Sequence, residues 1–328
     1  MMTKKSINNI GVFTSGGDAP GMNAALRAVV RTAIYHGKGV FTIKCGYEGM
    51  IDGEIERVDS RAVSNIIQTG GTVIKTARSE RFRTDHGRKQ AFENLKKFGI
   101  DGLIAIGGDG TFRGCVDFYK EYKLQIIGVP ATIDNDLYGT DFTIGYDTAV
   151  NTSLDAIDKI RDTSQSHKRF FIIEVMGRDA GFIGLETGIA GGAESILIPE
   201  VKTDVNELCS QIKSLFDRGK TSNIVVVAEG DDAGGAYEIG AKIKQKTGID
   251  YRVVILGHIQ RGGSPSAKDR LLASKLGYWS VKHLIDGKAN VMVGEINAKI
   301  VLTDMEDSVG KKKPIDMNAL EMAMVLAS

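Results

Sequence analysis

The chain has 328 residues, which is long for one ordinary domain and suits two. Its 42% hydrophobic and 25% charged residues are typical of a soluble globular protein with a full core. The 42 basic and 41 acidic residues leave a formal charge of +1, so bulk charge gives no reason to expect binding to nucleic acid or to an anionic membrane.

The cysteines and the N-terminal residues indicate the compartment. Cys45, Cys115 and Cys209 are odd in number and far apart, so they predict neither a zinc site nor a disulfide framework. The first residues lack the apolar core of a signal peptide, and the chain has no run of 18 apolar residues. We therefore expect a soluble protein of the cytoplasm.

Short apolar runs alternate with amphipathic stretches along the chain. This alternation predicts strands over 9–15, 102–106, 125–129, 169–175, 195–198, 223–228 and 252–256, and helices over 21–36, 111–122, 146–160 and within the tail from 314. The apolar runs IVVVA in strand 223–228 and VVIL in strand 252–256 lack polar alternation, which is typical of strands buried on both faces. The pattern indicates an α/β protein with parallel sheets and helices on both sides.

Two glycine-rich segments each follow a predicted strand. The first, Ser15–Gly21, leads into a helix whose N-terminus can bind a phosphate, although a tight turn would use the same glycines. In the second, Ile106–Thr111, the glycines let a polyphosphate approach the backbone, and Asp109 can hold Mg²⁺. It lacks Gly-Lys-Ser/Thr and so is not a Walker P-loop. Alone, it indicates a nucleotide kinase.

A third segment, Pro130–Asp136, adds two carboxylates. In an extended chain Asp134 and Asp136 point the same way and can face one site. One carboxylate can then take a hydroxyl proton while the other serves the metal. The alternative is a solvated acidic turn, and the preceding buried strand favours the site.

Cationic residues follow at predicted strand ends or beside glycines: Arg78, Arg169, Arg178, Arg252, His258 and Arg261. Guanidinium groups bind phosphate oxygens two at a time. Any one of these arginines alone is more commonly a surface residue, and His258 alone a packed histidine. The spacing of His258 and Arg261 beside a glycine pair favours phosphate binding.

Taken in order, the motifs TSGGDAPGMNAA, GGDGT, PATIDND, EVMGRDAG and LGHIQRGGSP resemble those of the bacterial-type ATP-dependent 6-phosphofructokinases. The resemblance extends to about residue 285 and is loose beyond it. It implies an α/β fold of two doubly wound Rossmann-like domains with mainly parallel sheets and the active site in the cleft between them. The larger, ATP-binding domain would hold 1–145 and about 260–310, and the smaller, sugar-phosphate-binding domain 146–259 and about 311–328. It further implies transfer of the ATP γ-phosphoryl group to the 1-hydroxyl of fructose 6-phosphate, the committed step of glycolysis, by a homotetramer.

The resemblance also implies roles for individual residues. The ATP site would be lined by Gly17, Arg78, Ser79, Gly108, Asp109, Gly110 and Thr111, with Asp109 on Mg²⁺. The catalytic residues would be Asp134 as base, Thr132 and Asp136 beside it, and Arg78 and Arg178. The sugar would be bound by Thr132, Ile133, Asp134, Met176, Gly177, Arg178 and Glu229, and its 6-phosphate by Arg169, Arg252, His258 and Arg261. Arg169 and Arg252 would come from a neighbouring subunit, so a monomer would be nearly inactive.

Two positions concern the phosphoryl donor. Pyrophosphate-dependent relatives generally carry Asp where this chain has Gly110 and Lys where it has Ala131. Both positions favour ATP, although Ala131 also differs from the usual Gly of the family. The alternatives are a pyrophosphate-dependent enzyme, a kinase for another substrate and a non-catalytic nucleotide-sensing subunit. A dehydrogenase is disfavoured because no Gly-x-Gly-x-x-Gly with a downstream acid follows the first strand.

Family members also bind ADP or phosphoenolpyruvate at an effector site. The matching residues are Arg27, Arg31, Arg161, Gly192, Glu194, Arg218 and Lys220. Ser60 and Ser222 stand where the family often has Arg and His. The pocket therefore has fewer cations, and the resemblance leaves the strength and sign of regulation open.

Overall fold

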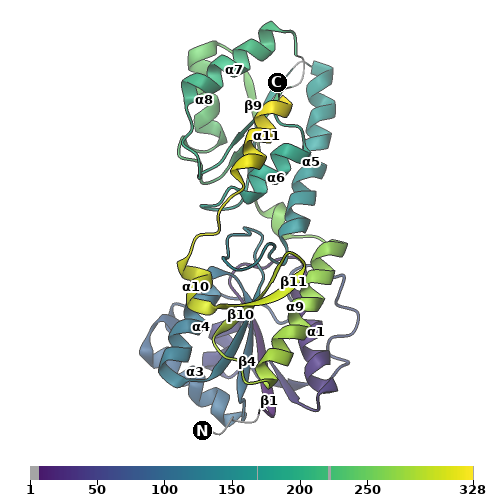
Figure 1. The fold of residues 1–328 in the computed structure, drawn as a ribbon, viewed down its shortest axis with the longest axis vertical. Helices are drawn as coiled ribbons and strands as arrows, with labels where there is room; N and C mark the ends of the chain where they lie inside the picture. Colours follow the sequence, from purple (N-terminus) through teal and green to yellow (C-terminus); the bar gives the residue numbers. More distant parts are fainter. Residues whose placement is uncertain (1–6, 168, 221–222, 328) are drawn as a thin grey trace. The chain divides into compact units, whose positions relative to one another are not determined.

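The protein is described by a computed structural model covering residues 7–167, 169–220 and 223–327. The chain forms two compact units (Figure 1). The large unit comprises Met1–Thr132, Leu137–Asp147 and Arg261–Lys313, and the small unit comprises Ile133–Asp136, Thr148–Gln260 and Pro314–Ser328. Each unit has its own sheet, so each is described separately.

The large unit is built on a seven-stranded sheet of order β11-β10-β5-β4-β1-β2-β3. Its strands are β1 (Asn9–Ser15), β2 (Gly39–Ile43), β3 (Ile55–Val58), β4 (Gly102–Gly107), β5 (Gln125–Pro130), β10 (Val291–Ile296) and β11 (Lys299–Asp304). The five strands from β10 to β2 run parallel, and only the outer pairs β2–β3 and β10–β11 are antiparallel. Every residue of the central strand β4 is buried, as expected for a strand covered on both faces.

Helices cover both faces of this sheet. They are α1 (Met22–Tyr35), α2 (Gly46–Asp52), α3 (Asp85–Lys97), α4 (Asp109–Tyr122), α9 (Ala267–Ile285) and α10 (Met305–Gly310), with a 3₁₀ turn η1 (Arg81–Arg83). Helices α1 and α9 pack together on one side, and α3 and α4 lie on the other (Figure 1). The core on the α3 and α4 side is aromatic, with Phe13, Phe112 and Phe118 almost fully buried.

The small unit has a four-stranded parallel sheet of order β7-β8-β6-β9. Its strands are β6 (Phe170–Val175), β7 (Ser195–Leu197), β8 (Asn223–Ala228) and β9 (Tyr251–Ile255). Its helices are α5 (Tyr146–His167), whose first two residues belong to the large unit, α6 (Phe182–Ala190), α7 (Val205–Asp217), α8 (Ala236–Thr247) and α11 (Met317–Ala327). A 3₁₀ turn, η2 (Gly257–Arg261), follows β9. The α/β class and the mainly parallel sheets predicted from the sequence are confirmed.

One burial prediction is wrong. Strand β8 is buried throughout, as its apolar run predicts, but β9 has no buried residue and Ile255 is 50% exposed. The reason is strand order, because β8 lies between two neighbours while β9 is an edge strand paired only with β6. An apolar run in the sequence does not distinguish these two positions.

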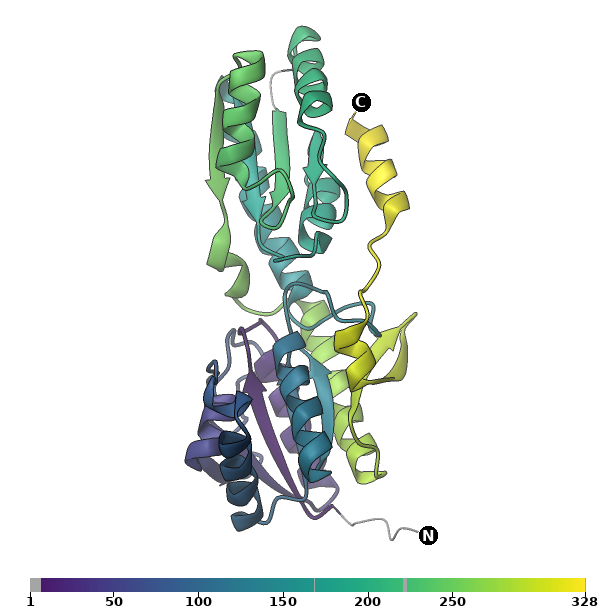
Figure 2. The same cartoon turned by 90° about the vertical axis from the view of Figure 1, so that its left-hand side faces the viewer.

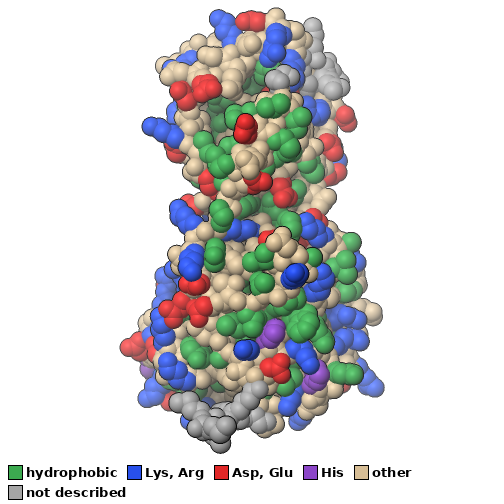
Figure 3. Space-filling view, in the orientation of Figure 1, with side chains coloured by type: hydrophobic (Ala, Val, Ile, Leu, Met, Phe, Trp, Pro, Cys, Tyr) green, Lys and Arg blue, Asp and Glu red, His purple; other side chains and the backbone are tan. Residues whose placement is uncertain are grey.

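The tail forms a helix that packs on the small unit, as predicted. Leu320 of α11 is buried with Leu185, Ile198 and Ala228, and Figure 2 shows α11 in yellow beside this unit's sheet. Basic and acidic side chains are interspersed over the face shown in Figure 3. None of the described helices is long and apolar enough to cross a membrane.

Candidate active site

The two glycine-rich segments and the acidic segment Pro130–Asp136 follow three adjacent strands of the large unit. In the parallel register Ser15 is level with Gly107, and Gly107 is level with Pro130. The strands β1, β4 and β5 therefore end together, and the segments that follow them start from the same edge of the sheet. In open α/β sheets, ligands bind at the carboxyl ends of strands.

Hydrogen bonds tie these segments together. The Thr111 hydroxyl donates to the Ser15 carbonyl at 3.0 Å, and the Ala131 N–H donates to the Gly107 carbonyl at 2.9 Å. A Cβ atom at Gly107 would lie 2.3 Å from Thr111 Oγ1, so a side chain at 107 would break this arrangement. At Gly108 a Cβ atom would lie 3.3 Å from the Cβ of Thr132, which brings the second and third segments into contact.

The start of α4 is accessible from solvent. Gly110 is exposed, and a Cβ atom there would meet nothing within 4 Å. Asp109 lies in the first helical turn with its side chain 35% exposed, and its carboxylate pairs with Arg113 at 2.9 Å. The part of the chain that the structure describes contains no group of three or more His, Cys, Asp or Glu able to hold a metal. Asp109 nevertheless fits Mg²⁺, which takes one or two protein carboxylates and completes its shell with substrate phosphates and water.

The segment that carries Arg78 and Ser79 is anchored beside the first glycine turn. The Thr76 hydroxyl donates to the Gly16 carbonyl at 2.7 Å, and the Thr14 hydroxyl donates to the Lys75 carbonyl at 2.9 Å. Arg78, two residues further on, is exposed. The segment thus reaches the edge of the sheet where the glycine turns begin.

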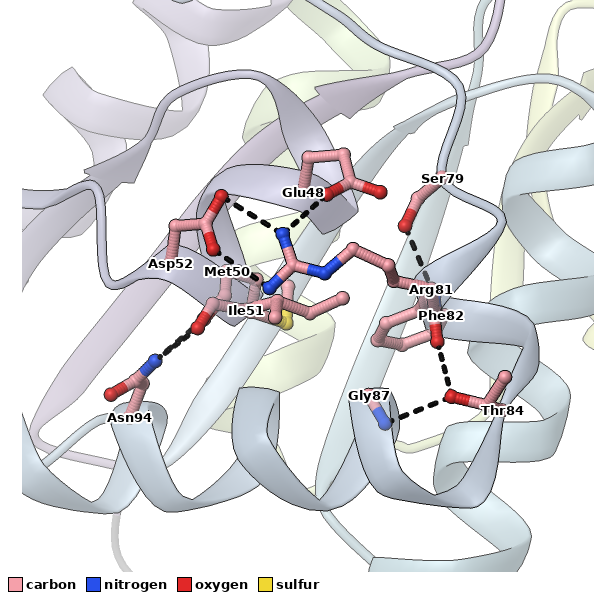
Figure 4. A network of polar contacts seen from close by, with 10 residues as sticks. All are labelled: Glu48, Met50, Ile51, Asp52, Ser79, Arg81, Phe82, Thr84, Gly87 and Asn94. Atoms are coloured by element: carbon pink, nitrogen blue, oxygen red, sulfur yellow. Dashed lines mark hydrogen bonds and ion pairs between the residues drawn. The ribbon is translucent and has the colours of Figure 1, made fainter.

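Arg81 fixes the other end of this segment (Figure 4). Its guanidinium binds Asp52 through two nitrogens, at 2.8 and 3.1 Å, and Glu48 at 2.9 Å. The hydrogen bond from Arg81 lowers the pKa of Asp52 below its ordinary value. Ser79 Oγ accepts the Phe82 N–H at 3.0 Å and so begins the η1 turn. Arg81 and Ser79 thereby set where Arg78 stands.

Arg261 lies on the first glycine turn, within the large unit. A Cβ atom at Gly17 would be 2.6 Å from Arg261 Nη1, which also approaches the Asp18 carbonyl at 3.4 Å. The structure therefore brings together a residue expected at the sugar phosphate and a residue expected at ATP. Gly17 has to be glycine for the guanidinium to take this place.

The acidic segment brings Asp134 close to Arg178 in the small unit. Asp134 is 3% exposed, and its Oδ2 lies 3.6 Å from Arg178 Nε, whose side chain is 55% exposed. The expectation that Asp134 and Asp136 lie on an extended chain and point the same way is wrong. Strand β5 ends at Pro130, and Asn135 has a φ of 54°, in the left-handed region that Asn tolerates better than most residues. The two carboxylates therefore differ, with Asp134 buried and Asp136 partly exposed.

The turn after β6 is held by Glu229. Its Oε1 accepts the Arg178 N–H at 2.8 Å and the Gly177 N–H at 3.3 Å. Gly177 has a φ of 145°, and a Cβ atom there would lie 2.3 Å from the Ala180 carbonyl oxygen, so the tight turn requires glycine. Four residues with expected sugar contacts, Met176 to Arg178 and Glu229, thus form one cluster.

Two further residues hold the candidate site in place, and neither of them was assigned a role from the sequence. The buried Thr143 donates its hydroxyl to the Thr132 carbonyl at 2.6 Å, in the large unit. The buried Gln260 accepts the Met176 N–H at 3.3 Å, in the small unit. The partner of Gln260 is distant in the sequence, whereas Thr132 is only 11 residues from Thr143. The position of Gln260 inside the GHIQR run was the one sequence signal for either residue.

Arg169 and Arg252 lie away from that cluster. Arg169 immediately precedes β6, and Arg252 is level with Phe171 near the start of β6, whereas Met176 follows the last residue of that strand. Six strand residues at about 3.3 Å each separate the two ends by roughly 20 Å. His258, by contrast, follows β9 and is exposed. Within one chain, the two arginines therefore stand at the opposite end of the sheet from Arg178.

Comparison with known proteins identifies the family. The phosphofructokinase family profile matches residues 9–284. A relative from Cytophaga hutchinsonii, an ATP-dependent 6-phosphofructokinase, is 55% identical over 97% of both chains. The chain belongs to the phosphofructokinase family. The ATP-dependent 6-phosphofructokinase 1 of Thermus thermophilus is 54% identical over 98% of this chain and all of its own. Phosphofructokinase from Saccharomyces cerevisiae superimposes with a TM-score of 0.89 at 37% identity, over 92% of this chain and 45% of its own.

Most of the residues matching the phosphofructokinase effector site cluster in the small unit. Glu194, with its side chain 2% exposed, lies 3.3 Å from Lys220 Nζ and 3.8 Å from Arg161 Nη1, and Arg161 also donates to the carbonyl of Gly192. Arg218 ends α7. Arg27 and Arg31 are on α1 of the large unit. Ser60 is exposed, and Ser222 lies outside the described residues.

Proposed function

We propose that this chain transfers the γ-phosphoryl group of ATP to the 1-hydroxyl of D-fructose 6-phosphate, giving fructose 1,6-bisphosphate and ADP in the committed step of glycolysis. The observation that carries the proposal is that two glycine-rich segments and the acidic segment start together at the ends of β1, β4 and β5, with the buried Asp134 on the acidic segment. Relatives more than 50% identical over nearly the whole chain bear the name of this activity.

The large unit supplies the nucleotide site in this proposal. The backbone amides of Gly17, Gly108 and Gly110 would receive the phosphates, because bare glycine backbone and a helix N-terminus favour anions. The hydrogen bond from the Thr111 hydroxyl to the Ser15 carbonyl holds the two glycine-rich segments together. Arg78 and Ser79 would reach the phosphates from their anchored segment. Asp109 would hold Mg²⁺, which neutralises phosphate charge when bound.

Asp134 is the proposed general base. Phosphoryl transfer needs in-line placement and charge neutralisation, and little covalent chemistry from the protein. Asp134 would take the proton of the 1-hydroxyl as its oxygen attacks the γ-phosphorus. The guanidinium of Arg178, 3.6 Å away, offsets the cost of keeping this buried carboxylate charged. Thr132 and Asp136 would flank the reacting groups, and Arg78 would stabilise charge on the transferring phosphoryl group.

The sugar phosphate would be recognised in the small unit. Ile133, Met176, Gly177, Arg178 and Glu229 would contact the sugar, and His258 and Arg261 its 6-phosphate. Arg169 and Arg252 would act on the site of a second copy of the chain, which their position at the opposite end of β6 supports. The working form would then be a homotetramer, with each phosphate site completed by a neighbour.

Regulation and donor choice complete the proposal. The cluster around Glu194, with Arg218, Arg27 and Arg31, would bind ADP or phosphoenolpyruvate, and activity titrations with each would detect it as a shifted substrate dependence. Gly110 and Ala131 would select ATP over pyrophosphate. We place the enzyme in the cytoplasm, with the other glycolytic reactions.

The experiment that tests the proposal is product identification. The enzyme with Mg²⁺, γ-labelled ATP and fructose 6-phosphate should yield fructose 1,6-bisphosphate labelled at the 1-phosphate. The Asp134→Asn variant keeps the shape of the side chain. In the same assay it should form the labelled product at a small fraction of the wild-type rate. Label released only as inorganic phosphate, or no label transfer, would overturn the proposed reaction.

A further inference from the structure

Gln260 is a fully buried amide in the η2 turn, between His258 and Arg261. Its relative exposure is 0%, and its carboxamide makes three hydrogen bonds. Oε1 accepts the Met176 N–H at 3.3 Å and lies 3.0 Å from the Ser153 hydroxyl, while Nε2 donates to the Gly257 carbonyl at 3.1 Å. The orientation of the amide follows from its partners, because a backbone N–H only donates and a carbonyl only accepts.

These partners belong to three different segments. Ser153 is on α5, Met176 opens the turn after β6, and Gly257 opens η2. A single side chain therefore links helix α5, the proposed sugar-binding turn Met176–Arg178 and the proposed phosphate-binding turn Gly257–Arg261. No shorter or purely accepting side chain makes all of these bonds at once.

The contact with Met176 completes the anchoring of the sugar-binding turn. Its three successive N–H groups, those of Met176, Gly177 and Arg178, all point to side-chain oxygens. Gln260 accepts the first and Glu229 accepts the other two. Glu229 is exposed and is already expected to contact sugar, whereas Gln260 is buried and bonds to two backbone groups and to the Ser153 hydroxyl.

We infer that Gln260 is a positioning residue for the sugar-phosphate site, which sets the register between the Met176–Arg178 turn and the Gly257–Arg261 turn. Without it, the buried Met176 N–H and the partly buried Gly257 carbonyl lose these partners. Such a loss favours local rearrangement of both turns. This inference rests on the proposed function, since it assigns Gln260 to the binding of fructose 6-phosphate.

The consequence is a selective kinetic defect. In Gln260→Met, which keeps the length of the side chain, the KM for fructose 6-phosphate should rise about tenfold or more. The KM for ATP and kcat at saturating sugar should stay within about twofold, because the nucleotide turns lie on strands of the other unit. Gln260→Glu keeps an acceptor for Met176 but, as a carboxylate, has no donor for Gly257, so it should share the defect and serves if the Met variant does not fold.

The matched control is Ile243→Val, a buried residue of α8 in the same unit. It should lower the urea concentration at which the protein unfolds, because it removes a buried methyl group, and leave both KM values unchanged. A folded Gln260 variant whose KM for fructose 6-phosphate matches the wild type would overturn the inference while wild-type activity upholds the function. An equal rise in both KM values would also overturn it. A wild type with no activity on fructose 6-phosphate would remove the function and the inference together.

Discussion

The Nε atom of Arg178 lies 3.6 Å from the Oδ2 atom of Asp134. The pair joins the acidic segment after β5 to the turn after β6, so it places the proposed base next to the proposed sugar-binding turn. The buried member is the carboxylate and the exposed member is the cation. The carboxylate proposed as the base is thus held inside the protein, while the arginine beside it remains accessible from solvent.

Replacing Asp134 should remove most of the chemistry and little of the binding. We expect Asp134→Ala to lower kcat by on the order of 10²- to 10⁴-fold, the usual contribution of a general base. The KM for fructose 6-phosphate should change much less. Steady-state rates with both substrates varied measure this. A kcat within a few fold of the wild type, with sugar binding intact, would show that Asp134 is not the base.

Replacing Gly110 by aspartate should weaken ATP binding without unfolding the protein. A side chain at 110 meets nothing within 4 Å, and an acid in the first turn of α4 suits the helix dipole. Its charge would repel the phosphates, and we expect the KM for ATP to rise at least about tenfold, equivalent to about 1.4 kcal/mol. Gly110→Ala, which adds a methyl group and no charge, is the control. Equal KM values for ATP in the Ala and Asp variants would show that the phosphates of ATP do not bind beside Gly110.

Two inactive variants should restore activity when they are assembled together. Asp134→Ala lacks the base, and Arg252→Ala lacks the cation proposed to act on a second copy. Mixed oligomers would contain sites with the base from one chain and the arginine from the other. Unfolding and refolding the two variants together should recover a measurable fraction of wild-type activity, whereas each refolded alone stays inactive. Absence of recovery in verified mixed oligomers would mean that Arg252 serves its own chain.

Alkaline pH should destabilise the large unit through Cys115. Burial raises the pKa of its thiol to about 12, against about 8.5 in an unfolded chain. Between these values the unfolded chain loses the proton and the folded chain keeps it, so the stability present below about pH 8.5 falls as pH rises. At pH 10 this one group accounts for about 2 kcal/mol.

Urea unfolding at pH 8 and pH 10 checks this prediction. Cys115→Ala should lose less stability between the two pH values than the wild type does. Cys45→Ser, at a partly exposed position, is the matched control and should keep the wild-type dependence. An identical pH dependence for the wild type and Cys115→Ala would contradict the assignment of the buried thiol.

The sequence predicts what local patterns determine. The bounds of β1 and β8 agree with their apolar runs, and the two glycine-rich segments and the acidic segment were placed after strands that the structure confirms. Exposure of β9 was not predictable, because it depends on which strand stands at the edge. The left-handed Asn135 was missed because a run of Asp-Asn-Asp is compatible with both extended and turned backbone.

Contacts that form only in the folded chain account for the site residues that the sequence did not predict. Gln260 contacts Met176, which is far away in the sequence, and Thr143 contacts Thr132 across the turn that follows β5; composition and spacing reveal neither contact. The position of Arg261 against Gly17 is of the same kind, since the two residues meet only because of how the large unit folds. Local motifs thus indicated the chemistry, whereas the residues that support the site could be recognised only in the folded structure.

The most direct test of the proposed function is an initial-rate comparison with fructose 6-phosphate and Mg²⁺, in which ATP or pyrophosphate is the donor. We predict fructose 1,6-bisphosphate with ATP and none above background with pyrophosphate. Turnover with pyrophosphate would contradict the proposal that Gly110 and Ala131 select ATP as the donor. No product with either donor, from an assembled oligomer, would contradict the assigned reaction itself.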